Sequence, residues 1–386
     1  MQVEKLGDIC EIASGGTPKR SEDSYWKNGK IPWLKISDIK SKYIDKSEEH
    51  ITQKGLDNSS AKLFKKGTII YTIFATVGEV AILNIDATTN QAIAGLTIKD
   101  SAQINPSYLF YFLKSIKKQM HLLSRGVAQN NINLSVLRQI KVPIPDLNVQ
   151  ERIVNALDQM QNNIKLRQME LSKLDILIKA RFVEMFGDIK NNKNYNYKLI
   201  SDLTNVVSGG TPKRDVKEYW DRGTIPWVKT TELKNNKVNS TEEYITKTGL
   251  QNSSAKLVPS HTILIAMYGQ GKTRGMTAYL EKEAATNQAC ACILPCSKIN
   301  SEYLWQYLIM SYEELRNLAK GGNQPNLNSR MIKDFPILDP PIALQNKFVS
   351  FIHQVDKSKV VNASIMKYII SIRFYLYFKE NKEGAR

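Results

Sequence analysis

The sequence predicts an α+β protein in which two similar globular domains are joined by two long antiparallel helices that form a coiled coil. Three observations lead to this prediction. The two halves of the chain repeat each other, each half mixes strand-like and helix-like patterns, and each half ends in a long stretch with a coiled-coil seam. The predicted domains cover 1–145 and 188–340, and the predicted helices cover 146–187 and 341–386.

The internal repeat is long and keeps its order. Residues 14–33 return as residues 208–227, with 13 of 20 positions identical at an offset of 194. The match continues through an NSSAKL element, a TNQA element and an INxxYL element in each half. Because this period is far longer than that of a solenoid, each repeat unit is a domain followed by a connector.

Short apolar runs and helical spacing alternate within each half. The runs 68–73 and 262–266 are bounded by turn residues, which is typical of buried strands. The segments 108–121 and 303–318 have apolar residues at helical spacing. This mixture predicts the α+β class.

Each domain is followed by a stretch with alternating apolar steps of three and four, which predicts a coiled-coil helix. Residues 147–186 contain neither Pro nor Gly. The two seams consist of Ile153, Leu157, Met160, Ile164, Leu171, Leu174 and Ile178, and of Phe348, Ile352, Val355, Met366 and Ile369. Arg167, Lys359 and Asn362 interrupt them, either to set the register or as side chains that extend out of the seam.

The composition predicts a basic protein with a polyanionic partner. Lys and Arg number 54 against 37 Asp and Glu, so the formal charge is +17. The alternative is a basic protein without such a partner. No apolar stretch approaches a membrane span and no lipid anchor is evident, so we expect no membrane partner and a cytoplasmic location. Four cysteines fit a reducing compartment.

Motifs for catalysis are missing where an enzyme would need them. Residues 339–341 read Asp-Pro-Pro, but Ile342 follows where a methyltransferase needs an aromatic ring. Residues 271–273 read Gly-Lys-Thr, but Ala266 stands where a phosphate-binding loop needs Gly. Three cysteines within 290–296 lack paired spacing and a nearby His. We therefore expect no catalytic residue and no metal site.

The sequence resembles the specificity subunits of type I restriction-modification enzymes. The resemblance rests on SGGTP followed by YW and IPW, on TNQA, on the Pro-containing exits at 142–145 and 335–341, and on the helix ending in MFGD at 185–188. It implies a non-catalytic protein in which each domain is a target recognition domain that reads one half of a split DNA sequence. The two helices would then act as a spacer.

The same resemblance implies partners and places the cofactors outside this chain. The partners would be double-stranded DNA, two modification subunits that use S-adenosylmethionine to methylate adenine, and restriction subunits that act as motor and nuclease with ATP and Mg²⁺. Two alternatives remain: a self-contained DNA methyltransferase or nuclease with degenerate motifs, and a stand-alone DNA-binding regulator. The second is less favoured because no helix-turn-helix is recognisable.

Base readout is expected where the two halves differ. Between matched flanks lie 25 residues (64–88) in the first half and 28 residues (258–285) in the second. Two domains on one scaffold that read different half-sites should differ in such loops. The candidate contact residues are Tyr71, Thr72 and Thr76 in the first half and Tyr268, Gln270, Lys272 and Arg274 in the second.

Two elements shared by both halves are further candidates. Lys19, Arg20, Lys213 and Arg214 can bind phosphate, or they can form the solvated tip of a turn. A second element occupies 125–131 and 320–326, where Gln and Asn can read adenine and Arg or Lys can hold phosphate, or where the same residues can cap neighbouring elements. Its candidates are Arg125, Gln129, Asn131, Lys320, Gln324 and Asn326.

Overall fold

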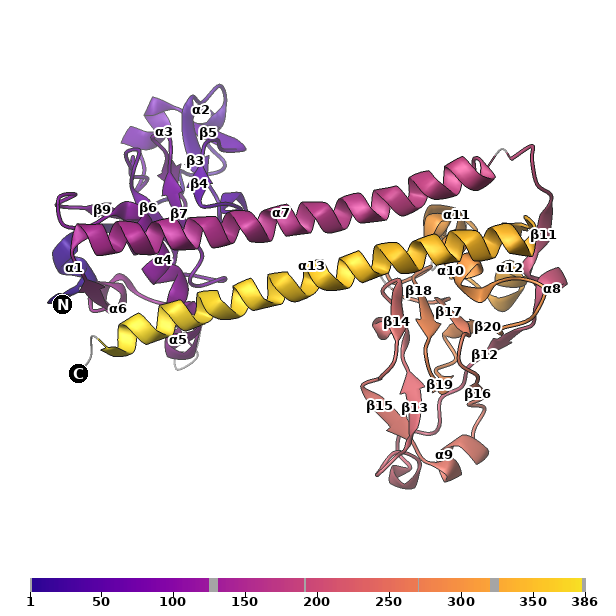
Figure 1. The fold of residues 1–386 in the computed structure, drawn as a ribbon. Coiled ribbons are helices and arrows are strands. Elements are labelled where there is room, and N and C mark those ends of the chain that lie inside the picture. Colours follow the sequence, from indigo (N-terminus) through magenta and orange to yellow (C-terminus); the bar gives the residue numbers. More distant parts are fainter. Residues whose placement is uncertain (1, 125–130, 191, 270, 320–325, 384–386) are drawn as a thin grey trace. The chain divides into compact units, whose positions relative to one another are not determined.

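The computed structural model describes residues 2–124, 131–190, 192–269, 271–319 and 326–383 (Figure 1). The chain forms two compact units: unit 1 holds residues 1–168 and 364–386, and unit 2 holds residues 169–363. The helices α7 (Leu147–Phe186) and α13 (Ile342–Glu383) each belong partly to one unit and partly to the other. Each unit therefore contains one globular domain and a section of both long helices.

A five-stranded sheet forms the centre of unit 1. Its strands lie in the order β2-β9-β6-β7-β4, and neighbours are antiparallel except for the parallel edge pair β7 and β4. These strands are β2 (Cys10–Ser14), β4 (Tyr43–Ile44), β6 (Ile69–Thr72), β7 (Val80–Leu83) and β9 (Ile93–Ile98).

Smaller sheets and short helices surround this sheet. A three-stranded sheet has the order β5-β3-β8, and β1 pairs with β10. The strands are β1 (Gln2–Lys5), β3 (Ile31–Leu34), β5 (Glu49–Ile51), β8 (Thr88–Thr89) and β10 (Lys141–Ile144). The helices are α1 (Leu6–Ile9), α2 (Asp23–Trp26), η1 (Ile36–Asp38), α3 (Gln53–Asp57), α4 (Pro106–Ser115), α5 (Lys117–Ser124) and α6 (Leu134–Arg138).

Unit 2 repeats this plan. Its central sheet has the order β12-β20-β17-β18-β14, again with one parallel edge pair. The smaller sheets have the orders β15-β13-β19-β16 and β11-β21. The strands are β11 (Tyr197–Leu199), β12 (Val206–Ser208), β13 (Ile225–Val228), β14 (Asn236–Val238), β15 (Glu243–Ile245), β16 (Leu257–Val258), β17 (Ile263–Ala266), β18 (Thr277–Leu280), β19 (Ala284–Thr286), β20 (Cys290–Ile293) and β21 (Pro336–Leu338). The helices are α8 (Ile200–Leu203), η2 (Lys217–Tyr219), η3 (Thr230–Glu232), α9 (Lys247–Gln251), α10 (Ser301–Met310), α11 (Tyr312–Asn317) and α12 (Ser329–Lys333).

The strands β6, β7, β17 and β18 are buried at every position because both faces of each central sheet are covered. In β17, Ile263 and Ile265 pack against the helices, whereas Leu264 and Ala266 pack into a core on the opposite face. All four residues of β6 are likewise buried. The α+β class predicted from the sequence is confirmed. The helical segments predicted over 108–121 and 303–318 are each divided into two helices, α4 with α5 and α10 with α11.

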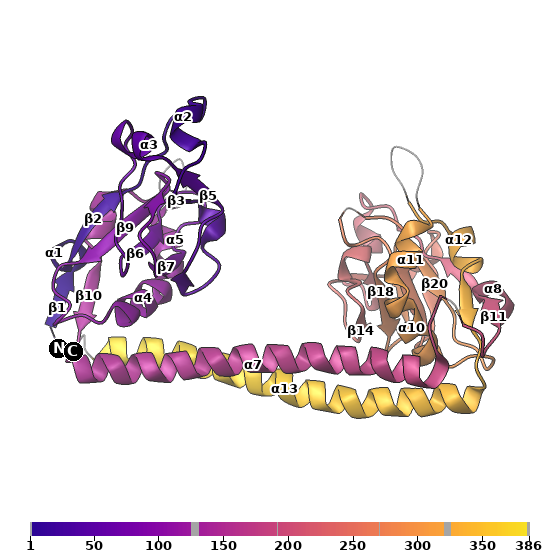
Figure 2. The ribbon, with the colours of Figure 1, turned by 90° about the horizontal axis from the view of Figure 1, so that it is seen from above.

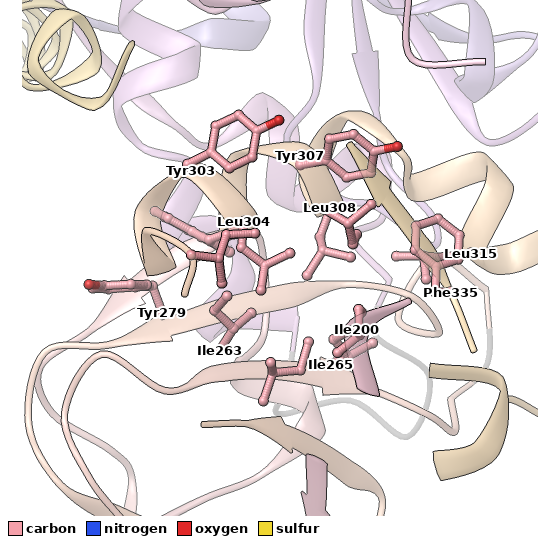
Figure 3. Close-up of a cluster of buried hydrophobic side chains, with 14 of the residues drawn as sticks. Ile200, Ile263, Ile265, Tyr279, Tyr303, Leu304, Tyr307, Leu308, Leu315 and Phe335 are labelled. Carbon is pink, nitrogen blue, oxygen red and sulfur yellow. The ribbon is translucent and has the colours of Figure 1, made fainter. Parts of the chain in front are cut away.

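In each unit one helix, α4 or α10, lies between the central sheet and the long helices (Figure 2). Figure 3 shows Leu304 and Leu308 of α10 directed toward Ile263 and Ile265, with Tyr303 and Tyr307 on the other side of the helix. The two tyrosine rings contact Phe182 of α7, with ring centroids 6.1 and 6.0 Å apart. Helix α10 thus connects the sheet to the long helices.

Within unit 2 the two long helices pack antiparallel. The ring of Phe182 meets that of Phe348 at a centroid distance of 5.5 Å, and Nζ of Lys359 lies 2.8 Å from Oδ1 of Asp175. Residues farther along α13 therefore contact residues farther back along α7. Lys359 is 26% exposed and pairs across the helices, so this interruption of the seam is bound to its partner helix.

A buried glutamine near the start of each long helix holds the loop before α4 or α10, which we call the bridging helix of its unit. Gln150 of α7 is 0% exposed, and its Oε1 accepts from N of Asn105 at 2.8 Å. Gln345 of α13 is 1% exposed, and its Oε1 accepts from N of Asn300 at 2.9 Å. Asn105 and Asn300 in turn cap α4 and α10. The glutamine shared by the two repeats is therefore structural.

Substitution of Phe182 by alanine tests the aromatic contact between α10 and α7. Because Phe182 is 0% exposed and contacts four aromatic rings, we expect Phe182→Ala to lower the free energy of unfolding of unit 2 by about 3–5 kcal/mol. Urea denaturation, with hydrogen exchange of the α10 amides as the probe of unit 2, measures this loss of free energy. Val183 is 54% exposed, so Val183→Ala should change stability by less than about 0.5 kcal/mol, and equal losses would contradict this packing.

Candidate nucleic-acid interface

The length difference between the divergent segments lies entirely in one hairpin of each central sheet. Strands β6 and β7 are joined by residues 73–79, here called the first hairpin tip, and β17 and β18 are joined by residues 267–276, the second hairpin tip. The four strands have four residues each. The first hairpin tip thus has seven residues and the second has ten, between pairs of strands of equal length.

Backbone hydrogen bonds bring three distant segments of unit 1 together at the first hairpin tip. N of Ile73 donates to O of Ala92 at 2.8 Å, and N of Ile132 donates to O of Ile73 at 2.9 Å. Next to Ala92, Oε1 of Gln91 accepts from Oγ1 of Thr17 at 2.5 Å. The SGGTP element, the TNQA element, the tip and the segment that begins at 131 are therefore neighbours in space.

Unit 2 has the same set of contacts. N of Met267 donates to O of Ala289 at 2.8 Å, and N of Leu327 donates to O of Met267 at 3.0 Å. Thr211 again donates to Gln288. The hairpin tip, the SGGTP element and the TNQA element thus meet at one edge of each central sheet, together with Ile132 in unit 1 and Leu327 in unit 2. We call these two places the first and second tip edge.

Two expected contact residues of the first half lie inside the protein. Tyr71 and Thr72 are both 0% exposed, because every residue of β6 faces one of two cores. Burial raises the pKa of Tyr71, so its hydroxyl is protonated at neutral pH. Oγ1 of Thr72 accepts from N of Glu79 at 2.8 Å and donates to O of Thr76 at 2.5 Å, which closes the tip. Neither side chain has surface for a base, whereas Thr76 is exposed.

The second hairpin tip presents larger polar side chains. Tyr268 is 42% exposed, Lys272 is exposed and Arg274 is half-buried. Gln270 lies outside the described residues. The exposed side chains therefore differ between the tips in chemistry as well as in number.

The third candidate element is described only in part. Asn131 is half-buried beside Ile132, and Asn326 is exposed beside Leu327. The other candidates, which are Arg125, Gln129, Lys320 and Gln324, lie outside the described residues. The capping role is filled by two other asparagines, since Asn133 caps α6 and Asn328 caps α12.

The shared SGGTP, NSSA and TNQA elements form a tightly packed joint. A Cβ on Gly15 would lie 2.1 Å from Oγ1 of Thr89, and one on Gly16 would lie 2.3 Å from Oγ of Ser60. Nε1 of Trp33 donates to O of Gly16 at 3.0 Å. The corresponding joint of unit 2 has equally close approaches at its two glycines. Only glycine fits such contacts, which explains why both halves carry this element.

Arg20 and Arg214, expected at phosphates, are engaged within their own units. The Cζ of Arg20 lies 3.8 Å from the ring centroid of Trp26 and 4.5 Å from that of Trp33, and its guanidinium donates to Glu49 at 2.5 Å. Arg214 makes the same contacts with Trp220, Trp227 and Glu243. Both arginine side chains are 51% exposed, and the neighbouring Lys19 and Lys213 are exposed.

Glu49 and Glu243 are the carboxylates that pair with the basic side chains of these two clusters. Burial alone would raise the pKa of Glu49, but hydrogen bonds from Lys35 and Arg20 outweigh it and hold the pKa below the ordinary value of 4.5. Hydrogen bonds from Lys229 and Arg214 do the same for Glu243. Each carboxylate therefore stays ionised and fixes the arginine over the indole rings.

Two glutamines of the tip edges were not among the sequence candidates. Gln91 and Gln288 are exposed, and each accepts through Oε1 from a threonine hydroxyl. That bond orients the amide, whose Nε2 carries two donors. The repeat of TNQA could have indicated these glutamines, but the repeat alone does not show that Gln is exposed whereas the Thr of the same element is buried.

Within the described ranges no three His, Cys, Asp or Glu side chains gather so as to hold a metal ion. Burial raises the pKa of Cys10 to about 12 and that of Cys292 to about 11, so these thiols are protonated at neutral pH. No helix in the part of the chain that the structure describes has both the length and the apolar character that a membrane crossing needs.

Lowering the pH tests the arginine cluster. A carboxylate whose pKa is lowered by folding stabilises the folded state above its unfolded pKa, and this contribution is lost as the pH falls through the folded pKa. The double variant Glu49→Gln/Glu243→Gln should therefore melt lower than the wild type at neutral pH, and the gap should close as the pH falls below about 4.5. Thermal melting between about pH 3 and pH 7 measures it. Glu48, 62% exposed, offers the control variant Glu48→Gln, which should have a smaller effect; a gap that does not depend on pH would contradict the assignment.

Comparison with known proteins gives the family. A model described as the type I restriction modification DNA specificity domain matches the chain twice, over residues 1–175 and 192–367. The type I restriction enzyme MjaIX specificity subunit of Methanocaldococcus jannaschii is 27% identical over 384 residues, covering 93% of this chain and 87% of the relative. The EcoR124I/EcoR124II specificity subunit of Escherichia coli is 24% identical over 310 residues, covering 76% and 73%.

Solved structures share the fold. The S subunit of a type-I restriction-modification system from M. genitalium aligns with a TM-score of 0.53 and 15% identity, over 97% of this chain and 94% of that chain. A chain from a structure on complex assembly and conformational transition of the type I R-M system aligns with a TM-score of 0.64 and 15% identity, over 98% and 96%. The protein therefore belongs to the DNA specificity subunits of type I restriction-modification systems, which choose the DNA sequence and are themselves non-catalytic.

Proposed function

We propose that each unit of this specificity subunit reads one half of a bipartite DNA target with its tip edge. The observation that carries the proposal is that the two central sheets are alike whereas their hairpin tips differ. Both central sheets have the same strand order and the same contacts at the tip edge, yet one tip has seven residues and the other ten. A difference confined to an exposed hairpin changes what is recognised without changing the scaffold.

Within this proposal the residues of each tip edge have separate tasks. In unit 2, Tyr268, Lys272 and Arg274 contact bases together with Asn326 and Gln288, since Lys and Arg suit guanine and amides suit adenine. In unit 1, the smaller tip contributes Thr76 beside Asn131 and Gln91. Lys19 and Lys213 hold phosphate and add no sequence information.

Three groups of sequence candidates are not assigned a base contact. Tyr71 and Thr72 are left out because they are buried. Arg20 and Arg214 act mainly by holding the tryptophan cluster. Candidates between 125 and 130, between 320 and 325, and at 270 remain predictions from the sequence.

We further propose that this chain acts as a scaffold for catalytic partners. Two modification subunits that use S-adenosylmethionine would bind it, and restriction subunits that use ATP and Mg²⁺ can join. The repeat supports two copies of one partner, because two similar surfaces on one chain offer two similar binding sites. The chain itself would contribute no cofactor.

The long helices would set the gap between the half-sites. Helix α7 has 40 residues, which corresponds to a length of about 60 Å. Half-sites read from one side of the duplex lie about 34–36 Å apart, or one helical turn. In this arrangement the number of unread base pairs depends on helix length and not on the tips.

Insertion of one heptad into α7, matched by one in α13 so that the seam stays in register, tests the spacer. Seven helical residues add about 10 Å, or roughly three base pairs of duplex. We expect the preferred gap to grow while both half-sites stay the same, as measured by methylated-base mapping in cells with and without the chain. An unchanged gap, or a changed half-site, would sink the spacer model.

Substitutions in the tips test which unit reads which half. Tyr268→Ala with Lys272→Ala should lower the preference for one half-site by about 5- to 150-fold, equivalent to about 1–3 kcal/mol, and leave the other half-site unchanged. Thr76→Ala should affect the other half only. Selection from duplex pools with one half-site randomised at a time gives both values. The wild-type chain alone should neither methylate DNA with S-adenosylmethionine nor cleave it with Mg²⁺, which separates this proposal from a self-contained enzyme.

A further inference from the structure

The second hairpin tip is held from outside by two side chains of α11. Oη of Tyr312 donates to O of Lys272 at 2.6 Å. Nη1 of Arg316 donates to O of Gly271 at 2.9 Å, to O of Arg274 at 3.2 Å and to Oη of Tyr312 at 2.8 Å. Tyr312 and Arg316 are one helical turn apart, so both side chains reach the tip from the same face of α11.

The backbone of this tip depends on such support. Gly269 has φ +148°, Gly271 φ +59° and Gly275 φ +85°, which are conformations that glycine adopts readily and other residues rarely. Backbone with several glycines loses more conformational entropy when it is ordered, so an ordered tip needs contacts that offset this loss. A Cβ on Gly275 would lie 3.1 Å from Cγ of Arg316, so the tip is also packed closely on the anchor.

The first hairpin tip is held in another way. Oγ1 of Thr72 contacts O of Thr76 and N of Glu79, so a side chain of the hairpin itself closes the loop. From outside, Lys117 of α5 pairs with the side chain of Glu79. The corresponding helices α5 and α11 thus anchor the two tips by different contacts.

We infer that Arg316 and Tyr312 are positioning residues that determine the sequence preference of the second half-site by fixing the backbone of residues 271–274. The inference rests on the proposed function of the tip edges. With the carbonyls of Gly271, Lys272 and Arg274 bonded to α11, the exposed side chain of Lys272 is held where a base edge can be contacted at one register. The second specificity element therefore comprises the tip and the α11 pair, although some 40 residues separate them in the sequence.

The core does not depend on this pair. Leu315, which lies between Tyr312 and Arg316, belongs to the main core of unit 2, whereas Tyr312 and Arg316 are half-buried at the surface. Loss of the guanidinium should therefore leave the unit folded and release only the tip. A purely structural residue would instead weaken all DNA binding together with stability.

The test uses the full chain with Arg316→Gln and, separately, Tyr312→Phe, which removes one hydroxyl and keeps the ring. The probe is a pool of duplex DNA in which each half-site is randomised in turn. For Arg316→Gln we expect the preference at one half-site to fall about tenfold or more, as for loss of hydrogen bonds from a charged donor, with the other half-site and the melting temperature unchanged. Tyr312→Phe should shift the same half-site by less.

Arg330→Gln is the matched control, because Arg330 lies on α12 of the same unit, is 91% exposed and carries the same charge. It should weaken binding to all sequences slightly and alter no preference. Lys117→Gln should change only the half-site that Arg316→Gln leaves intact. The inference is overturned if Arg316→Gln behaves like Arg330→Gln or lowers both half-sites equally. A wild-type chain without preference at either half-site would instead refute the proposed function.

Discussion

The contact between the bridging helix and the long helices is the interaction on which each unit depends. In unit 2, Tyr303 stacks on Phe182 at an interplanar angle of 19°, and its hydroxyl donates to O of Leu338 at 3.2 Å. In unit 1, the hydroxyl of Tyr108 donates to O of Pro143 at 2.8 Å, and Tyr111 donates to Asp158 of α7. Large buried rings tolerate few alternative arrangements. The orientation of each central sheet on its section of α7 is therefore set by packing in the core.

The architecture could be predicted because its signals are repeated and local. The strand-like runs and the seams each appear in both halves, so each half supports the prediction made for the other. The division of 303–318 into α10 and α11 was not predicted, because the apolar spacing continues across Ser311, which is itself 0% exposed. The break matters, because it directs α11 toward the second hairpin tip.

The candidate site was predicted to the level of segments but not of side chains. Tyr71 and Thr72 stand in a continuous apolar run that predicts a strand buried on both faces, and they became candidates only because they adjoin the divergent hairpin tip. Lys19 and Arg20 follow glycines that both halves share, and a shared glycine fits close packing as well as a phosphate site. Arg316 carries no motif at all. Its contact with Gly271 and Arg274 depends on the tertiary structure, so no pattern in the sequence indicates it.

The presence of two units on one chain has a consequence for how a target is laid out. A symmetric dimer presents identical reading surfaces, so its target is a palindrome and looks the same from either end. Here the frames match but the tips are encoded separately, and a substitution in one tip leaves the other unaltered. If each tip reads its own half-site, the target is not a palindrome and has a direction along the duplex. A complex assembled on such a site can tell upstream from downstream.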